Sequence, residues 1–162
     1  LSFLGLPSLR DANENDKISL LATQFIGNPA DGSNPANGVW GVTAPLPDVG
    51  VLLPSEVQEI QTMLATANGA IAGSVPEGWA LFDLHGLYNE VVTTGVFEDD
   101  FNMTGDLVFG GFFSLDGFNP TSRGSALIAK RMLAAIDATY GSNLSDAGLD
   151  IGDYPTNYPD GI

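Results

Sequence analysis

The residues best suited to chemistry lie in one short stretch, which reads Asp-Gly-Phe-Asn-Pro-Thr over residues 116–121. An aspartate in such a loop can take part in acid–base chemistry, or it can serve as a cap or turn residue beside a helix. Gly117 permits a sharp bend, and Pro120 has the fixed backbone angle that suits a helix start. Taken alone, a capped loop that opens a helix accounts for every residue here without catalysis.

His85 is the only histidine in the chain and is the other candidate for acid–base chemistry. It follows an apolar run, residues 79–84, that is typical of a buried strand. A general base at the carboxyl end of a strand would suit an open α/β sheet. A single histidine at a strand–helix turn carries little signal, and we interpret it as a surface or capping residue.

Residues 116–124 resemble the last sequence block of the SGNH/GDSL family of lipases and acylhydrolases, Asp-x-x-His-Pro-Thr-x-x-Gly. In that block the aspartate and the histidine are two members of a Ser-His-Asp triad. The similarity runs nearly end to end, through residues 9–16, 45–52, the helix from Ser55, and residues 112–117, 135–136 and 140–143. The resemblance implies an α/β fold, namely the C-terminal part of a flavodoxin-like three-layer α/β/α domain, and a serine enzyme that hydrolyses carboxylic esters.

The chain departs from the family pattern at two places. Asp116 matches the triad acid, but Asn119 occupies the position of the triad histidine. A carboxamide has no usable protonation near pH 7, so Asn119 could keep a hydrogen bond to Asp116 and nothing more. The nucleophile block is missing too, since Gly105-Asp106 and Gly152-Asp153 are not followed by serine. Loss of a triad member costs about 10⁴–10⁶ in turnover, so we predict that this chain alone is inactive.

Two functions from different classes are compatible with this pattern. The chain can be the C-terminal half of an SGNH-type esterase whose serine belongs to the same precursor or to a partner chain. It can instead be a degenerate, catalytically dead module kept for binding, as an accessory or scaffold within a larger surface assembly. By resemblance, its location is outside the cytoplasm, either secreted or associated with the cell surface or outer membrane, and a lipid or ester is the expected substrate.

Hydrophobic periodicity predicts the elements that must position the Asp116 loop. Helices are expected at residues 14–24, 55–72, 86–94 and 121–140, with Asp11, Asn13 or Asn15 capping the first and Ser55 the second. Residues 79–84 are predicted to be one strand of a parallel sheet, and residues near 107–113 are the candidate for a second. Residues 27–54 form a long surface loop, in which Val39, Trp40 and Val42 are expected anchors, and residues 142–162 form an acidic tail. One or two strands leave a sheet incomplete, so we expect another polypeptide segment to complete it.

Composition limits the remaining function classes. The 162 residues include 44% hydrophobic residues, enough for one domain, residues 1–162, with a core. Twenty acidic residues against five basic ones make nucleic acid an improbable partner. No apolar run is long enough to span a bilayer. The chain has no cysteine, and Asp11-x-Asn13-x-Asn15 lacks the glycine and the final glutamate of a calcium loop, so we expect no metal and no cofactor. Leu1 and the lack of a signal-peptide pattern suggest an internal or processed fragment.

Overall fold

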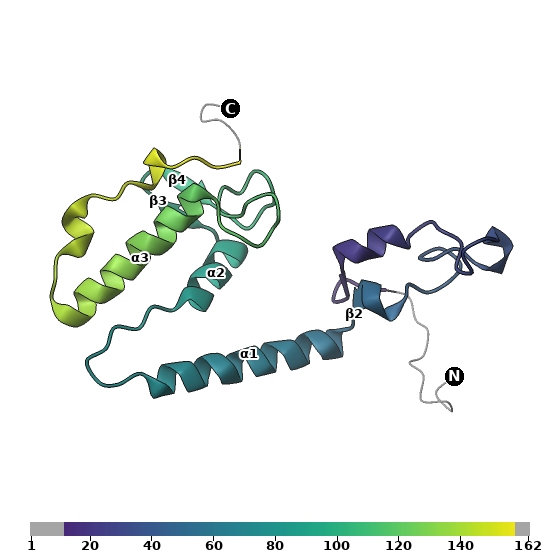
Figure 1. Cartoon of the computed structure of the whole chain (residues 1–162), viewed down its shortest axis with the longest axis horizontal. Coiled ribbons are helices and arrows are strands. Elements are labelled where there is room, and N and C mark those ends of the chain that lie inside the picture. Colours follow the sequence, from purple (N-terminus) through teal and green to yellow (C-terminus); the bar gives the residue numbers. More distant parts are fainter. Residues whose placement is uncertain (1–11, 158–162) are drawn as a thin grey trace. The chain divides into compact units, whose positions relative to one another are not determined.

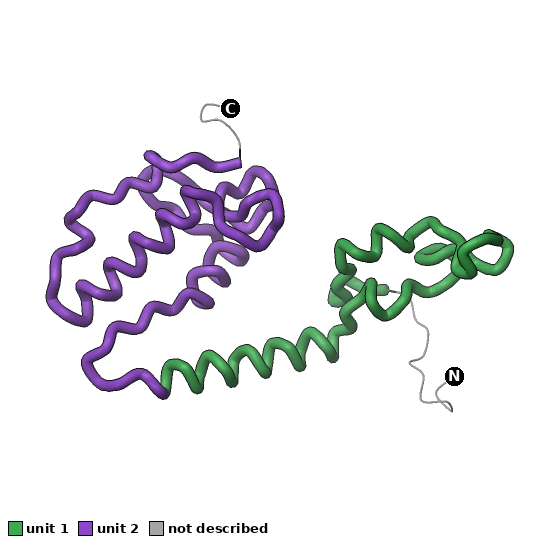
Figure 2. Tube along the Cα trace, viewed as in Figure 1, with its two compact units in different colours: residues 1–73 green, residues 74–162 purple. Residues whose placement is uncertain are grey.

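A computed structural model describes residues 12–157 of the chain (Figure 1). The chain divides into two compact units, residues 1–73 and residues 74–162, which Figure 2 shows in separate colours. Helices and small antiparallel sheets make up both units, which is a mixed α/β content. That residues 1–162 form one domain stays a prediction.

The first unit is built around a short antiparallel pair, β1 (Lys17–Ile18) and β2 (Val51–Leu52), in which Lys17 lies opposite Leu52. Three short 3₁₀ helices accompany it, at Leu20–Gln24, Pro35–Asn37 and Asp48–Gly50. Ala22 is fully buried against Gly50, where an added Cβ would lie 3.3 Å from the Ala22 Cβ. The close approach of these two small residues fixes the contact between the first and third 3₁₀ helices.

Most of residues 14–24 do not form the predicted α-helix, and this expectation is wrong. The Asn13 side chain accepts a hydrogen bond from the Asn15 backbone N–H at 2.9 Å, and Asp16 accepts one from Asn13 N–H at 2.7 Å. Such local side-chain bonds compete with helical backbone bonds. Neither Asn13 nor Asn15 caps a helix, and Asp11 lies outside the described residues.

Helix α1 (Pro54–Ser74) confirms the prediction of a helix at residues 55–72. Its first turn is held by Glu56, whose side chain accepts a hydrogen bond from Leu53 N–H at 2.7 Å, as in a capping box. Ser55, the predicted cap, lies inside the helix instead. No residue of α1 is buried, and in the preceding loop Val42, a predicted anchor, is 73% exposed.

The second unit contains α2 (Leu84–Thr93), the hairpin of β3 (Val96–Glu98) and β4 (Phe101–Met103), and α3 (Ser122–Tyr140). Two 3₁₀ helices, at Leu144–Ala147 and Ile151–Asp153, follow α3. The strands are antiparallel, with Val96 opposite Met103. Both turn residues of the hairpin, Asp99 and Asp100, have positive φ angles of 46° and 66°, which matches the twist of a two-residue hairpin.

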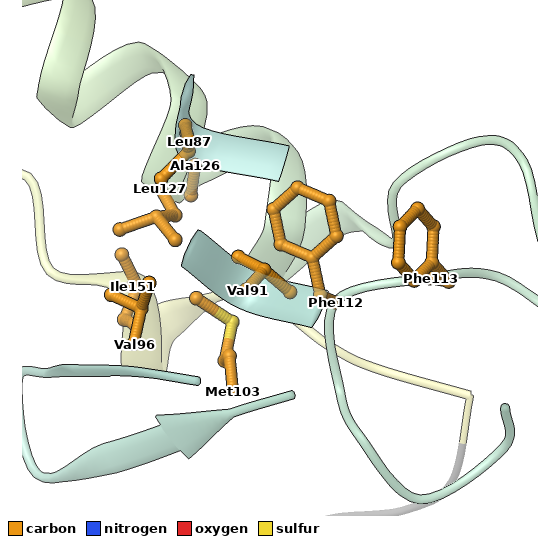
Figure 3. Packing of buried hydrophobic residues seen from close by; sticks show 9 residues of the cluster. All are labelled: Leu87, Val91, Val96, Met103, Phe112, Phe113, Ala126, Leu127 and Ile151. Atoms are coloured by element: carbon orange, nitrogen blue, oxygen red, sulfur yellow. The ribbon is translucent and has the colours of Figure 1, made fainter. Parts of the chain in front are cut away.

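The core of the second unit collects side chains from α2, β3, β4, α3, the 3₁₀ helix Ile151–Asp153 and residues 112–113, and Figure 3 shows the nine buried members. They are Leu87, Val91, Val96, Met103, Phe112, Phe113, Ala126, Leu127 and Ile151. Phe112 is fully buried, and its ring meets those of Phe113 and Tyr88 edge-on, at centroid distances of 4.9 and 5.1 Å. The core therefore extends directly to the residues that precede the Asp116 loop.

Helices α2 and α3 confirm the predictions at residues 86–94 and 121–140, and Gly141 ends α3 in the left-handed conformation with φ 64°. On α3, Ala126 and Leu127 are buried, whereas Met132 is 44% exposed. The segment after α3 is more than an acidic tail, since Ile151 lies in the core.

The predicted strands are wrong. Residues 79–83 form no strand, and residues 107–113 form turns with one isolated parallel bridge between Thr104 and Gly111. Within residues 12–157 both sheets have two antiparallel strands, so the predicted parallel sheet is not found there. The physical reason is that an apolar run becomes a strand only where a neighbouring backbone pairs with it.

Candidate functional site

The carboxylate of Asp116 accepts four hydrogen bonds from its own loop. Its Oδ1 atom accepts from Ser114 Oγ at 2.7 Å and from the backbone N–H groups of Phe118 and Asn119 at 2.8 and 2.9 Å. Its Oδ2 atom accepts from Asn119 Nδ2 at 2.7 Å. These donors hold the pKa of Asp116 well below its ordinary value, with the Ser114 hydroxyl as the largest cause. The carboxylate is therefore a fixed anion at neutral pH.

The loop is anchored at both ends to the core and to helix α3. Ser114 N–H donates to the Asn119 carbonyl at 2.8 Å, and Gly117, with φ 72°, turns the chain between them. Thr121 caps α3, because its Oγ accepts from Gly124 N–H at 3.0 Å and donates to the Gly111 carbonyl at 2.7 Å. Asp116 is thus a turn residue, and the helix cap is Thr121.

Gly124 is required by packing rather than by chemistry. A Cβ atom at this position would lie 2.5 Å from the Phe112 carbonyl oxygen, which is closer than real atoms approach. Thr121 and Gly124 together let the first turn of α3 press against the segment that carries Phe112 and Phe113. The spacing Pro-Thr-x-x-Gly therefore positions the Asp116 loop on a rigid base.

The sequence allows Asn119 to keep a hydrogen bond to Asp116, and the Asn119 Nδ2 atom donates to Asp116 Oδ2 at 2.7 Å. In a Ser-His-Asp triad, the imidazole donates its Nδ1–H to the acid and uses its other nitrogen to take a proton from serine. Here the Asn119 amide nitrogen stands in for Nδ1–H. An amide has no second basic nitrogen, so the pair can hold its geometry but cannot move a proton. Both side chains are exposed.

His85 does not lie in the Asp116 loop and has a local contact of its own. It is the second residue of α2, is exposed, and lies 3.2 Å through Nε2 from the Asn89 side-chain nitrogen on the same helix. Asp83, which precedes it, caps α2 by accepting from Gly86 N–H at 2.8 Å. This arrangement fits the interpretation of His85 as a surface histidine.

A second aspartate, at the other end of α3, has the same kind of surroundings as Asp116. Asp137 accepts from Ser142 Oγ at 2.5 Å, from Leu144 N–H at 2.8 Å, and from Ser145 N–H and Oγ at 2.8 and 2.6 Å. Its pKa is also lowered, chiefly by the Ser142 and Ser145 hydroxyls. A carboxylate saturated with donors is thus a loop-building device in this chain. Only the side-chain amide of Asn119 sets Asp116 apart.

Two shallow cavities of the second unit lie away from Asp116 and Asn119, which together form the Asp116 pair. One is lined by residues 91–95 and 104–106. The other is lined by residues 81–83, by Gly86, Leu87 and Glu90 of α2, and by Arg131 and Ala135 of α3. Among residues 12–157, no group of three His, Cys, Asp or Glu side chains could hold a metal ion.

Sequence reasoning missed two residues that shape this region. Ser114 supplies the largest influence on the Asp116 pKa, and a serine two residues before an aspartate was the available signal. Arg123 is 5% exposed, and its Nε donates to the Ile151 and Tyr154 carbonyls at 3.2 and 3.0 Å. Its guanidinium also lies 4.0 Å from the Phe101 ring centroid. These contacts join segments distant in sequence, so periodicity gave no signal for them.

Comparisons with protein families, with characterised proteins and with solved structures give no match for this chain. The resemblance to SGNH/GDSL hydrolases therefore depends on the residues and spacings quoted above. None of the helices in the described part of the chain combines the length and the apolar character that a bilayer crossing requires.

Proposed function

We propose that this chain is one portion of an SGNH/GDSL-type serine esterase or lipase, in which Asp116 supplies the triad acid. The contact of 2.7 Å between Asn119 Nδ2 and Asp116 Oδ2 carries the proposal, because it reproduces the acid–base contact of a triad with an amide in place of the imidazole. The nucleophile and a functional base lie on another segment or another chain. Alone, this chain does not hydrolyse esters.

The surroundings of the pair suit an ester with an apolar acyl group. Leu115 and Phe118, on the loop itself, are 65% and 82% exposed. Leu107 is 54% exposed and approaches the same loop, because its Cδ1 would lie 3.7 Å from a Cβ placed on Gly117. Exposed apolar side chains gathered at one loop favour an apolar ligand or partner.

The first experiment tests whether the Asp116 contact has triad geometry. In the variant Asn119→His, the nearby carboxylate should raise the pKa of the introduced imidazole by about 1 unit or more. The control is the double variant Asp116→Asn with Asn119→His, which keeps the size of the side chain and removes the charge. Titration of the imidazole protons by NMR measures both values. Equal pKa values in the two variants would contradict the proposal.

The second experiment locates the nucleophile. The isolated chain should neither hydrolyse p-nitrophenyl butyrate nor react with a fluorophosphonate probe, which labels activated serines. In the native assembly the probe should attach to a serine on another segment. Labelling of a serine within residues 1–162 would overturn the proposal, because it would place the nucleophile in this chain.

The second candidate function is a binding or scaffold module, and the exposed apolar loop residues favour it. Asn119 keeps the loop closed without proton transfer, so the same geometry can serve recognition alone. This candidate predicts that fluorophosphonate labels nothing in the native assembly. It also predicts that Asn119→His leaves binding to the partner unchanged while Phe118→Ser weakens it.

A further inference from the structure

The segment 79–82 has the alternating exposure of a strand but no strand beside it. Trp79 and Leu81 are 67% and 46% exposed, whereas Ala80 and Phe82 are half-buried, and Phe82 packs against the core cluster. Alternate residues therefore point to opposite faces, as in an extended chain. Asp83, with φ −83° and ψ 84°, ends the segment, and Leu84 N–H donates to the Phe82 carbonyl across it, as in an inverse γ-turn.

One hydrogen-bonding edge of this segment is used by the chain itself. In an extended chain, the N–H and C=O groups of alternate residues point to the same edge. On the edge of residues 80 and 82, Ala80 N–H donates to Tyr140 Oη at 3.2 Å, and the Phe82 carbonyl accepts from Leu84. On the other edge, Leu81 N–H, Leu81 C=O and Trp79 C=O have no hydrogen-bond partner among the described residues.

A shallow groove lies beside the segment. Leu81 and Asp83 line it together with Glu90 of α2 and Arg131 of α3. The groove thus places two carboxylates beside the free backbone groups of Leu81.

The charges around the segment decide which kind of polypeptide fits. Glu77, Asp83 and Glu90 flank the segment and its groove, while Arg131 is already paired with Glu98 at 3.1 Å. The whole chain carries a net charge of −15, so a second copy would be repelled. Acidic surroundings favour a partner with lysine or arginine beside its apolar residues.

We propose that the free edge of residues 79–82 pairs, as one strand of a two-stranded ladder, with an extended, basic-flanked apolar segment of another polypeptide. Leu81 exchanges backbone hydrogen bonds with the incoming strand, and Trp79 and Leu81 cover its apolar side chains. The segment is short, which limits the number of backbone bonds and makes the complex weak. This inference goes beyond the proposed function and uses no residue of the Asp116 pair, so the two can fail separately.

The experiment uses the full chain with Trp40→Phe, which leaves Trp79 as the only tryptophan. The probe is the peptide acetyl-Lys-Val-Thr-Val-Thr-Val-Lys-amide, which has alternating apolar residues and basic ends. Its addition should shift Trp79 fluorescence to shorter wavelength in a saturable way. The same peptide with alternate backbone nitrogens methylated keeps every side chain but cannot form the ladder, and it should bind about tenfold or more weakly.

Two further comparisons complete the test. Leu81→Pro removes the free N–H group and should weaken binding about tenfold, whereas Leu81→Ile keeps it and should bind as before. A peptide with glutamate in place of both lysines should bind at least several-fold more weakly. Circular dichroism checks that Leu81→Pro is folded, and the methylated peptide tests the ladder without any change in the protein.

Several outcomes would overturn the inference. They are the absence of a saturable shift at peptide concentrations up to about 1 mM, equal binding of the methylated peptide, and equal binding of the glutamate-flanked peptide. A shift that grows with protein concentration in the absence of peptide, together with dimer formation in sedimentation, would assign the edge to a second copy of the chain. That result would also overturn the proposed partner.

Discussion

The two units of this chain differ most in what they bury. The second unit, residues 74–162, assembles nine buried apolar side chains from its helices, its hairpin and the segment after α3. In the described part of the first unit, Ala22 is the one buried hydrophobic residue, and α1 leaves Ile60, Met63, Leu64 and Ile71 between 43% and 65% exposed. A helix normally depends on a packed apolar face for its stability. The unit with the candidate site therefore has an internal core of its own, whereas residues 12–73 of the first unit bury only Ala22 among their hydrophobic residues.

The core of the second unit supports both the Asp116 loop and the free edge of residues 79–82. The Asp116 loop is positioned by the core through Phe112 and Phe113, so its geometry does not require another chain. The segment 79–82 lies in the same unit and has one face on that core. A rigid unit that presents a closed loop and a free backbone edge is suited to docking onto a larger assembly. The partner predicted from the sequence, one that completes a sheet, stays a prediction.

The largest expected effect comes from removing the centre of the second unit's core. Phe112→Ala should lower the free energy of unfolding of this unit by about 3–5 kcal/mol, because Phe112 is fully buried. The matched control is Phe118→Ala, in which an 82% exposed ring is removed with a change within about 0.5 kcal/mol.

The two tryptophans allow each unit to be followed separately in urea. Trp79 reports on the second unit and Trp40 on the first, so each experiment is run in a variant that keeps one of them. Phe112→Ala should move the Trp79 transition and leave the Trp40 transition in place. If both transitions moved together, the units would unfold as one, and the contrast between them would be lost.

The next effect concerns Arg123, which joins α3 to the segment that follows it. Arg123→Met keeps much of the side-chain volume but removes the Nε bonds to the Ile151 and Tyr154 carbonyls. We expect a loss of about 2–3 kcal/mol in the second unit, since buried bonds to a charged group are lost. Arg131→Met, which removes a 41% exposed partner of Glu98, should cost about 0.5 kcal/mol.

Hydrogen exchange provides a local readout for the same pair of variants. Amides of residues 151–154 should exchange faster in Arg123→Met and remain protected in Arg131→Met. Equal protection in the two variants would show that the Arg123 side chain does not hold the segment after α3.

The sequence was sufficient for three of the four predicted helices and for one contact of the site. Apolar periodicity predicted α1, α2 and α3 because each has a length and a face that only a helix satisfies. It failed at residues 79–84, since an apolar run does not show whether a neighbouring backbone exists to pair with it. It missed β3 and β4, which have three residues each and too little pattern to detect.

The candidate site likewise has one contact that the sequence could predict and other features that it could not. The contact between Asn119 and Asp116 joins residues three positions apart and could be predicted. The roles of Gly124 and Ile151 could not, because one is set by the Phe112 carbonyl and the other by packing against distant segments. Neither role leaves a periodic signal in the sequence, because each depends on a contact between segments that lie far apart along the chain.

Lowering the pH should destabilise the second unit more than the first. Asp99, Asp116 and Asp137 of the second unit have pKa values below the ordinary value of 3.8, and in the first unit the pKa of Asp31 is lowered as well. The pKa of Asp99 is lowered chiefly by its hydrogen bond from Lys130, at 2.6 Å. A carboxyl whose pKa is lower in the folded state stabilises fully above its unfolded pKa and loses that contribution as the pH falls through its folded pKa.

The stability of the second unit should therefore decline as the pH falls below about 4. Because Asp116 is exposed and Asp99 and Asp137 are only half-buried, solvent screens their charges, and the decline should be smaller than the loss in Arg123→Met. Urea midpoints of the Trp79 and Trp40 transitions between pH 7 and pH 2.5 measure it. The variant Asp137→Asn should reduce the slope for Trp79 alone, and an unchanged slope would contradict the role given to Asp137.

The smallest expected effect is that of Ile60→Ala on the stability of the first unit, and its sign shows whether the apolar face of α1 is covered. Ile60 is 51% exposed on α1, and alanine has the higher helix propensity by about 0.4 kcal/mol. If the apolar face of α1 is uncovered in the isolated chain, Ile60→Ala should stabilise the first unit slightly, as measured by the Trp40 transition. A covered face would give the opposite sign and a loss of about 2 kcal/mol or more, because a packed isoleucine would be replaced by a cavity. If Ile60→Ala stabilises the first unit in the isolated chain but destabilises it when a partner is added, α1 is an interface. The two units would then differ in a further way, since only the first would need a partner to stay folded.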